Sequence, residues 1–366
     1  MSIAAAGPAD YGMMSNLISD TASVKQKLDQ LTEQISSGLV SDTYGGLGAS
    51  ASVSLNLNPQ IADLQTWQNN INAAAGTMQV TQTAMTQIQQ IASNFLSQTE
   101  NLEGSDSSEV DTIAASAQQA LVEVAGLLDT QSGDTYVFGG ADSTNPPVPD
   151  PDSILSNGFY TQIAAQVQAL GAQGASATIT NTVGIASSNA VGTSPFSAYM
   201  SQPASSLQAP AIQVGQGQTA TVGLLASANS FVTSQGTTTT PPTSTGSYIR
   251  DVMMALATMG SLSSSQVSDS GFQTLVQSTN ATLTGAVSAM AEDAGVLGNT
   301  QSALTTSQTT MQDTATALTT QVGNVQDVDV AQAMTNLSLV QTQLSASYQV
   351  IASMSGLSLA KFLPAG

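Results

Sequence analysis

Few side chains of this 366-residue chain could carry out chemistry. The chain has no histidine and no cysteine, so the commonest general base, the commonest metal ligand and any thiolate nucleophile are missing. Closely spaced carboxylates remain in two places, Asp150 with Asp152 and Asp327 with Asp329. Two such groups can share acid–base catalysis, so an enzyme that uses one of these pairs is one hypothesis. No segment has the spacing of an EF-hand calcium loop.

A structural explanation is available for each carboxylate pair. Asp150 and Asp152 lie in a proline-rich stretch that is typical of a loop. Asp327 and Asp329 stand where a helix is predicted to begin, and carboxylates in a first turn oppose the positive end of the helix dipole. We therefore expect no enzymatic activity, no catalytic residue, no metal site and no cofactor.

Two glycine-containing segments match nucleotide-binding loops only in part. Residues 41–50 are rich in glycine, but the lysine that a phosphate-binding loop requires does not follow them. Gly215, Gly217 and Ala220 have the spacing Gly-x-Gly-x-x-Ala, but a strand is predicted after them, where a dinucleotide site needs a helix. The first segment therefore predicts a structural turn, and the second predicts a β-hairpin.

The charge of the chain narrows the range of its partners. Twenty-four acidic residues face four basic ones, which gives a net charge of −20. Nucleic acids and anionic membranes attract clustered Lys and Arg, so we expect neither as a partner. No apolar run approaches the roughly 18 to 20 residues of a membrane span. The first residues lack the basic and apolar parts of a secretory signal, so export, if it occurs, is expected without a cleaved signal.

The elements that would position any site are mainly helices. At each end of the chain, apolar residues recur three and four residues apart, which is the narrow seam of a coiled coil. Such seams predict terminal helices that pack against each other or against other subunits. The first helix is expected over about residues 11–36, with Gly38 after its end, and the last one begins at about residues 327–329. The predicted assembly seam consists of Met14, Leu17, Val24, Leu28, Leu31, Ile35, Leu337, Val340, Leu344, Ile351 and Met354, with Thr21 and Ser347 as polar members.

The pattern between the two ends predicts three parts. Residues 1–145 would form an N-terminal helical arm and part of a helical core, with a helix that starts at Pro59. Residues 146–246 would form a variable, outward-facing α+β domain, and residues 247–366 the C-terminal helical core and terminal coiled-coil helix. The fold class is thus mainly α, with long coiled-coil helices from both termini packed together and a smaller, β-rich α+β central insert.

Local signals within these parts give more detailed expectations. Serine, threonine, alanine and glycine dominate the central part. It is expected to contain a short helix over residues 154–170, a strand over residues 175–183 and a hairpin over residues 211–222. A long helix is expected over about residues 271–322, with Gly323-Asn324 as a break before the last helix.

Short motifs at both ends resemble those of bacterial flagellins and of the hook-associated protein at the hook–filament junction. Gln34-Ile35-Ser36-Ser37-Gly38 matches the family's Gln-x-Ser-Ser-Gly helix end, in which Ser37 and Gly38 are the motif residues. Ser41-Asp42 and the glycine-rich turn occupy the place of its Ser-Asp-Asp-Pro segment. Asp327-Val328-Asp329-Val330-Ala331 is similar to the Asp-x-Asp-x-Ala that opens its last helix. The resemblance covers about residues 11–140 and 270–363.

Two further motifs favour the junction protein over the filament protein. Tyr136-Val137-Phe138-Gly139-Gly140, followed by Pro146-Pro147, resembles its Tyr-x-Phe-x-Gly…Pro-Pro stretch. The ending with Leu357 and Leu359 is similar to its Leu-Ser-Leu-x-x-x-Leu terminus. The chain departs from the family at Leu39, because the family carries arginine after the Ser-Ser-Gly. Neutral amide and apolar contacts would have to replace the corresponding ion pairs.

The resemblance implies a structural subunit of the bacterial flagellum that works outside the cell. It implies export without a cleaved signal, an export chaperone, and partners that are copies of itself and other flagellar axial proteins. It also implies terminal helices that are poorly ordered in the monomer and pair as coiled coils in the assembled tube. A filament flagellin is the alternative within the family. A surface adhesin with a ligand-binding central domain is the alternative outside it.

Overall fold

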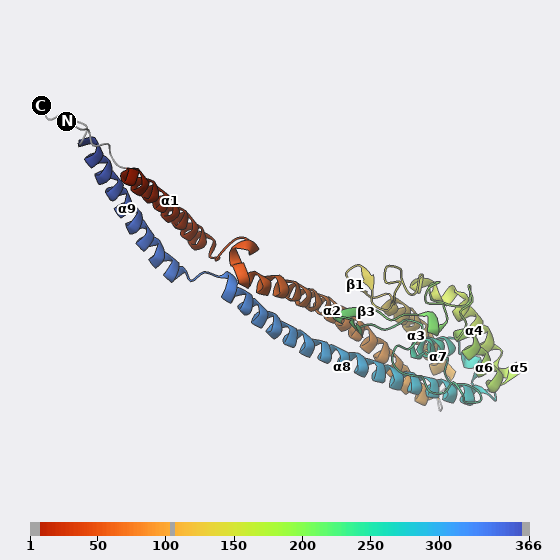
Figure 1. The fold of residues 1–366 in the computed structure, drawn as a ribbon. Helices are drawn as coiled ribbons and strands as arrows, with labels where there is room; N and C mark the ends of the chain where they lie inside the picture. Colours follow the sequence, from red (N-terminus) through yellow and green to blue (C-terminus); the bar gives the residue numbers. More distant parts are fainter. Residues whose placement is uncertain (1–7, 103–106, 361–366) are drawn as a thin grey trace, which may run out of the picture. The chain divides into compact units, whose positions relative to one another are not determined.

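The computed structural model describes residues 8–102 and 107–360 (Figure 1). They form two compact units: the first combines the two ends of the chain, up to Gln65 and from Gln312, and the second comprises Thr66–Met311. The chain is mainly helical, as predicted. No helix in the described ranges has the length and apolar content that a membrane span requires. The division into three parts at residues 146 and 246, with the middle part facing outward, stays a prediction.

The first unit is built from helices that come from both ends of the chain. Helix α1 packs alongside α9, so the terminal helices lie together as predicted (Figure 1). Helix α1 ends as expected at Gly38, which adopts φ +75 and donates its N–H to the carbonyl of Gln34 at 2.9 Å. The elements of this unit are α1 (Pro8–Ser37), the 3₁₀ turn η1 (Tyr44–Ser50), the start of α2 (Ala51–Leu102), the end of α8 (Phe272–Gln326) and α9 (Val330–Ala360).

Two helix boundaries differ from the sequence prediction. Helix α2 begins at Ala51 rather than at Pro59, which lies inside the helix. A proline in that position removes the N–H that would bond the carbonyl of Leu55, yet the helix continues through it to Leu102. The predicted break at Gly323-Asn324 is also wrong, because α8 continues to Gln326. A single glycine lowers helix stability without ending the helix.

The second unit surrounds one helix, α7, in which every residue is buried. Its apolar side chains join those of α2, α3 and α8 in one continuous core. The smaller elements cover this core. In chain order the unit contains α2 from Thr66 to its end, α3 (Ser107–Leu128), β1 (Gln131–Ser132), β2 (Thr135–Tyr136), η2 (Pro151–Ser156), α4 (Gly158–Gln168), α5 (Leu170–Gln173), α6 (Ala175–Ala186), η3 (Ala204–Ser206), β3 (Ala211–Gly215), β4 (Gln218–Thr221), α7 (Tyr248–Gly260), η4 (Ser264–Gln266) and the start of α8.

The central part of this unit is more helical than the sequence indicated. The hairpin is confirmed: β3 pairs antiparallel with β4, with an irregularity in register between Gln213 and Gly215. The strand predicted over residues 175–183 is wrong, because this segment forms helix α6. Its threonines, isoleucine and valine are typical of strands, but they are buried with a helical spacing of three and four residues. The buried positions are Ala175, Thr178, Ile179, Thr182, Val183 and Ala186.

Candidate assembly surface

The apolar seam between α1 and α9 is the centre of the first unit. Leu31, Ala333 and Val340 are 7%, 3% and 5% exposed and form its buried core. Val24, Leu28, Ile35, Val328 and Leu337 pack against them. The seam is narrow, so each helix keeps most of its circumference free for other contacts.

Most residues of the predicted seam contribute to this cluster. Leu17, Leu344 and Ile351 are half-buried at positions that continue the same spacing. The side chains of Met14 and Met354 lie outside the described residues. Ala333 was missed, although it stands four residues before Leu337 and so continues the three-and-four spacing toward the start of the helix. Whether this seam also acts between subunits stays a prediction.

Helix α9 carries a second set of apolar side chains that the described residues of the first unit leave exposed. Leu339 is 67% exposed, beside the buried Val340, and Met334 and Tyr348 are 56% and 53% exposed. Val330 and Val350 on α9 and Ile18 on α1 are exposed as well. A helix that is apolar on more than one side is typical of a helix enclosed by neighbours. These exposed side chains are therefore candidate contacts for further apolar helices around α9.

The two family motifs from opposite ends of the chain meet at one connection. Leu39 and Asp327 form an isolated antiparallel bridge. The N–H of Val40 donates to the carbonyl of Gln326 at 2.7 Å, and the N–H of Val328 donates to the carbonyl of Gly38 at 2.9 Å. This bridge ties the end of α1 to the junction between α8 and α9.

The side chains of these motifs cap the adjoining helices and turns. The Oδ1 atom of Asp329 accepts the N–H of Gln332 at 3.0 Å, as a residue that caps the start of α9 does. The hydroxyl of Ser37 accepts the N–H of Leu39 at 3.2 Å. Asp327 acts through its backbone instead, since its N–H bonds to the carbonyl of Gly323 at 2.7 Å. The side chains of Leu357 and Leu359 lie outside the described residues.

The carboxylate pairs considered for catalysis are exposed on the surface. Asp150 and Asp152 flank the start of η2, and Asp327 and Asp329 belong to the connection just described. Within the ranges that the structure describes, no three acidic side chains come together as a metal site. Nothing in this geometry favours the enzyme hypothesis.

A buried charged network in the second unit was not anticipated from the sequence. Asp293 of α8 is fully buried and accepts the backbone N–H groups of Ser230, Phe231 and Val232 at 3.2, 3.2 and 2.9 Å. It also accepts the hydroxyl of Tyr248 at 2.7 Å. Burial, and then Asp293, raise the pKa of Tyr248 well above its ordinary value.

Asp251, on the same helix as Tyr248, is held in a similar way. It accepts hydrogen bonds from the Ser244 hydroxyl at 2.6 Å and from the N–H and hydroxyl of Thr245 at 2.6 and 2.7 Å. Burial raises the pKa of Asp251 to about 6, although these hydrogen bonds and the neighbouring Arg250 oppose the shift. Burial lowers the pKa of Arg250 to about 10, so it remains cationic at neutral pH. The polar signal was present in the sequence, as Arg250-Asp251 interrupts an apolar run.

Comparison with known families agrees with this architecture. Residues 10–142 match the bacterial flagellin N-terminal helical region, and residues 280–363 match the bacterial flagellin C-terminal helical region. Together the two matches cover more than half of the chain. The chain belongs to the bacterial flagellin family. No curated protein matches the sequence.

Membership in the flagellin family indicates what kind of protein contains the seam between α1 and α9. Flagellins are structural proteins that assemble into extracellular flagellar filaments, so the chain is a flagellar structural subunit. The matched regions contain both motifs that meet at the Leu39–Asp327 bridge and the whole of α9. Residues 143–279, between the matched regions, contain most of the charged network.

Val340→Asp tests the packing of α1 against α9. An unpaired carboxylate in this seam costs about 3 kcal/mol or more, so α1 should separate from α9 more often. Trypsin should then cut after the exposed Lys25 and Lys27 roughly tenfold faster or more, as measured by mass spectrometry of a timed digest. Leu339→Asp is the matched control, because Leu339 is exposed, and its cleavage rate should equal that of the unaltered chain. Equal rates in all three proteins would contradict the packing.

Asp251 predicts that mild acid stabilises the second unit. Its pKa is raised above the ordinary 3.8 to about 6, so between these values the folded chain binds the proton more readily than the unfolded chain. The free energy of unfolding therefore rises as pH falls through 6, and the gain is lost as pH rises again. Melting temperatures measured by circular dichroism at about pH 5 and 7 should differ less in Asp251→Asn than in the unaltered chain. The exposed Asp152→Asn should keep the full difference, and an unchanged difference in Asp251→Asn would refute the assignment.

Proposed function

We propose that this flagellar subunit is the hook-associated protein of the hook–filament junction. The observation that supports this role is the Tyr136–Gly140 motif with Pro146-Pro147, which resembles the junction protein. A filament flagellin is the alternative, and the two family matches fit it equally well.

The junction-like motif connects α3 to the central segment. Phe138 is fully buried, and its carbonyl accepts the N–H of Ala226 at 3.1 Å. Gly139 forms an antiparallel bridge with Leu225. Gly140 adopts φ +60, and a Cβ atom at this position would lie 2.8 Å from the carbonyl oxygen of Gln208. Only glycine fits both the positive φ and the close contact at position 140, which explains this residue of the motif.

We further propose that α9 mediates assembly through both of its apolar sides. The side that contains Val340 packs on α1, and the side that contains Leu339 and Val350 would pack on neighbouring subunits. Ion pairs play little part, since the chain has only four basic residues. Apolar and amide contacts would then hold the subunits together. Before assembly, an export chaperone would cover these same apolar surfaces.

The abundance of the chain in flagella separates the two roles. Sheared and purified flagella should contain this chain in trace amounts, similar to those of other hook-associated proteins, because a junction needs few copies. Quantitative mass spectrometry against the other flagellar subunits measures this ratio. A chain that dominates the sample would be a filament flagellin. Its complete absence would contradict both flagellar roles and leave the adhesin hypothesis.

Leu344→Asp and Ile351→Asp test the assembly seam. Each places a carboxylate at a half-buried position that continues the seam, so incorporation into flagella should be lost. The second unit should keep its melting transition, because neither residue belongs to it. Immunoblots of sheared flagella measure incorporation. If both variants enter flagella as the unaltered chain does, the seam is not an assembly surface.

A further inference from the structure

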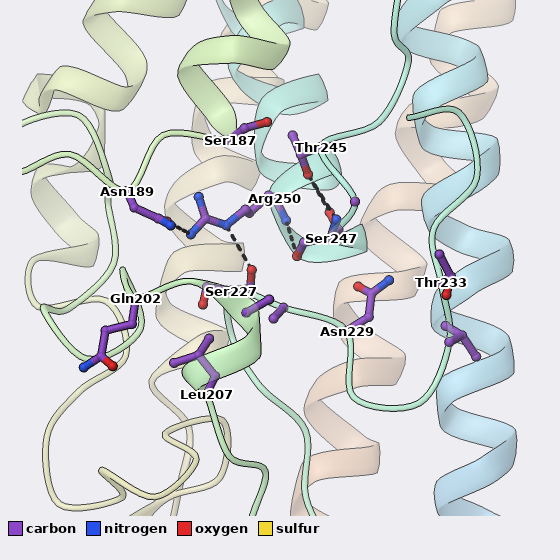
Figure 2. Close-up of a pocket in the computed structure, with 14 residues that line it drawn as sticks. Ser187, Asn189, Gln202, Leu207, Ser227, Asn229, Thr233, Thr245, Ser247 and Arg250 are labelled. Atoms are coloured by element: carbon purple, nitrogen blue, oxygen red, sulfur yellow. Dashed lines mark hydrogen bonds between the residues drawn. The ribbon is translucent and has the colours of Figure 1, made fainter. Parts of the chain in front are cut away.

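The second unit contains a cavity of about 350 Å³ near the start of α7. Figure 2 shows its walls, which come from α7, from the loop around Ser227–Thr233 and from the segment that includes Asn189 and Leu207. The lining mixes hydroxyl and amide groups with apolar side chains. Its polar members include Asn189, Gln202, Asn229, Thr233 and Arg250, and the apolar ones include Leu207.

Arg250 is the one charged side chain in this lining. It is only 6% exposed, and its guanidinium lies 4.9 Å from the ring centre of Phe196. Its Nε atom donates to the carbonyl of Ser227 at 2.9 Å. The Nη1 atom donates to the carbonyls of Ala186 and Ser188 at 2.9 and 3.3 Å. The Nη2 atom donates to Oδ1 of Asn189 at 2.7 Å.

These contacts leave one hydrogen-bond donor of Arg250 without an acceptor, and none of them is an ion pair. A guanidinium has five N–H groups, and four are used, so one Nη2 N–H has no acceptor among the described residues. All four acceptors are neutral. No carboxylate in the described part of the chain lies within the 4.0 Å of an ion pair with Arg250. Asp251 acts on Arg250 through its charge, but its oxygens are bound to Ser244 and Thr245.

A buried cation without an ionic partner favours an anion in the adjoining space. The volume is at the lower end of the range for small-molecule sites. The amide of Gln202 and the hydroxyl of Thr233 match a ligand with hydroxyl groups, and Leu207 matches a carbon skeleton. We propose that this cavity binds a small hydroxylated carboxylate of sugar-acid size, with its carboxylate against the Nη2 atom of Arg250. The cavity lies within the second unit, so the proposal does not depend on which flagellar subunit the chain is.

Calorimetric titration of the full-length chain with glucuronate tests this site. Glucuronate should bind saturably, while methyl glucoside, which lacks the carboxylate, should not. Arg250→Gln should weaken binding roughly tenfold to a hundredfold, as expected for the loss of a charged hydrogen bond. Ala204→Phe fills the rim of the cavity without touching the contacts of Arg250 and should also weaken binding. Ser205→Phe is the matched control, since Ser205 is the exposed next residue and does not line the cavity.

Trypsin gives a second measurement at the site itself. Arg250 is the only Lys or Arg between Leu28 and Ala360, so cleavage after it reports the opening of this region. At a glucuronate concentration of ten times its Kd, this cleavage should slow about tenfold, while cleavage after Lys25 and Lys27 stays unchanged.

Several results would overturn the proposal. These are an absence of saturable binding, equal binding of methyl glucoside, and full affinity in Ala204→Phe. Binding of inorganic phosphate without binding of glucuronate would refute the carboxylate assignment. If Arg250→Gln fails to fold, the proposal is tested by comparing the glucuronate affinity of Ala204→Phe with that of Ser205→Phe.

Discussion

The narrow apolar contact between α1 and α9 is the interaction on which the first unit depends. It joins the two ends of a 366-residue chain through side chains as small as Ala333. The bridge between Leu39 and Asp327 then fixes the register, because it pairs backbone groups at the point where both helices end or begin. Residues of the two family motifs therefore serve one purpose, which is to hold opposite ends of the chain in a defined alignment.

The chain has few charged residues. Among the described residues, the buried charged side chains all lie in the second unit. Arg250 and Asp251 of α7 and Asp293 of α8 bind backbone and side-chain groups of residues 227–245. The contacts of Arg250 and Asp293 join residues far apart in the sequence, so this long segment with little regular structure is held at several points. The several hydrogen bonds that each of these groups makes reduce the cost of its burial, whereas removal of one partner would be costly.

The sequence predicted the helical class, the paired ends and the hairpin, because these depend on repeated local patterns. It failed where local preference and packing disagree. Residues 175–183 are rich in β-branched side chains, yet the core selects a helix because their spacing fits one buried stripe. Pro59 resembled a helix start, although the helix begins at Ala51. The contacts of Arg250 and Asp293 could not be predicted, since they join residues up to 64 positions apart.

The uncovered apolar side chains of α9 have a thermodynamic consequence. In a lone subunit, Leu339, Tyr348 and Val350 lose part of the hydrophobic stabilisation that a helix gains when it is enclosed. If neighbouring subunits bury these residues, as proposed, they bind only the folded helix and by linkage raise its stability. The stability of this end of the chain would then depend on subunit concentration, and folding of α9 and growth of the assembly would be two descriptions of one equilibrium.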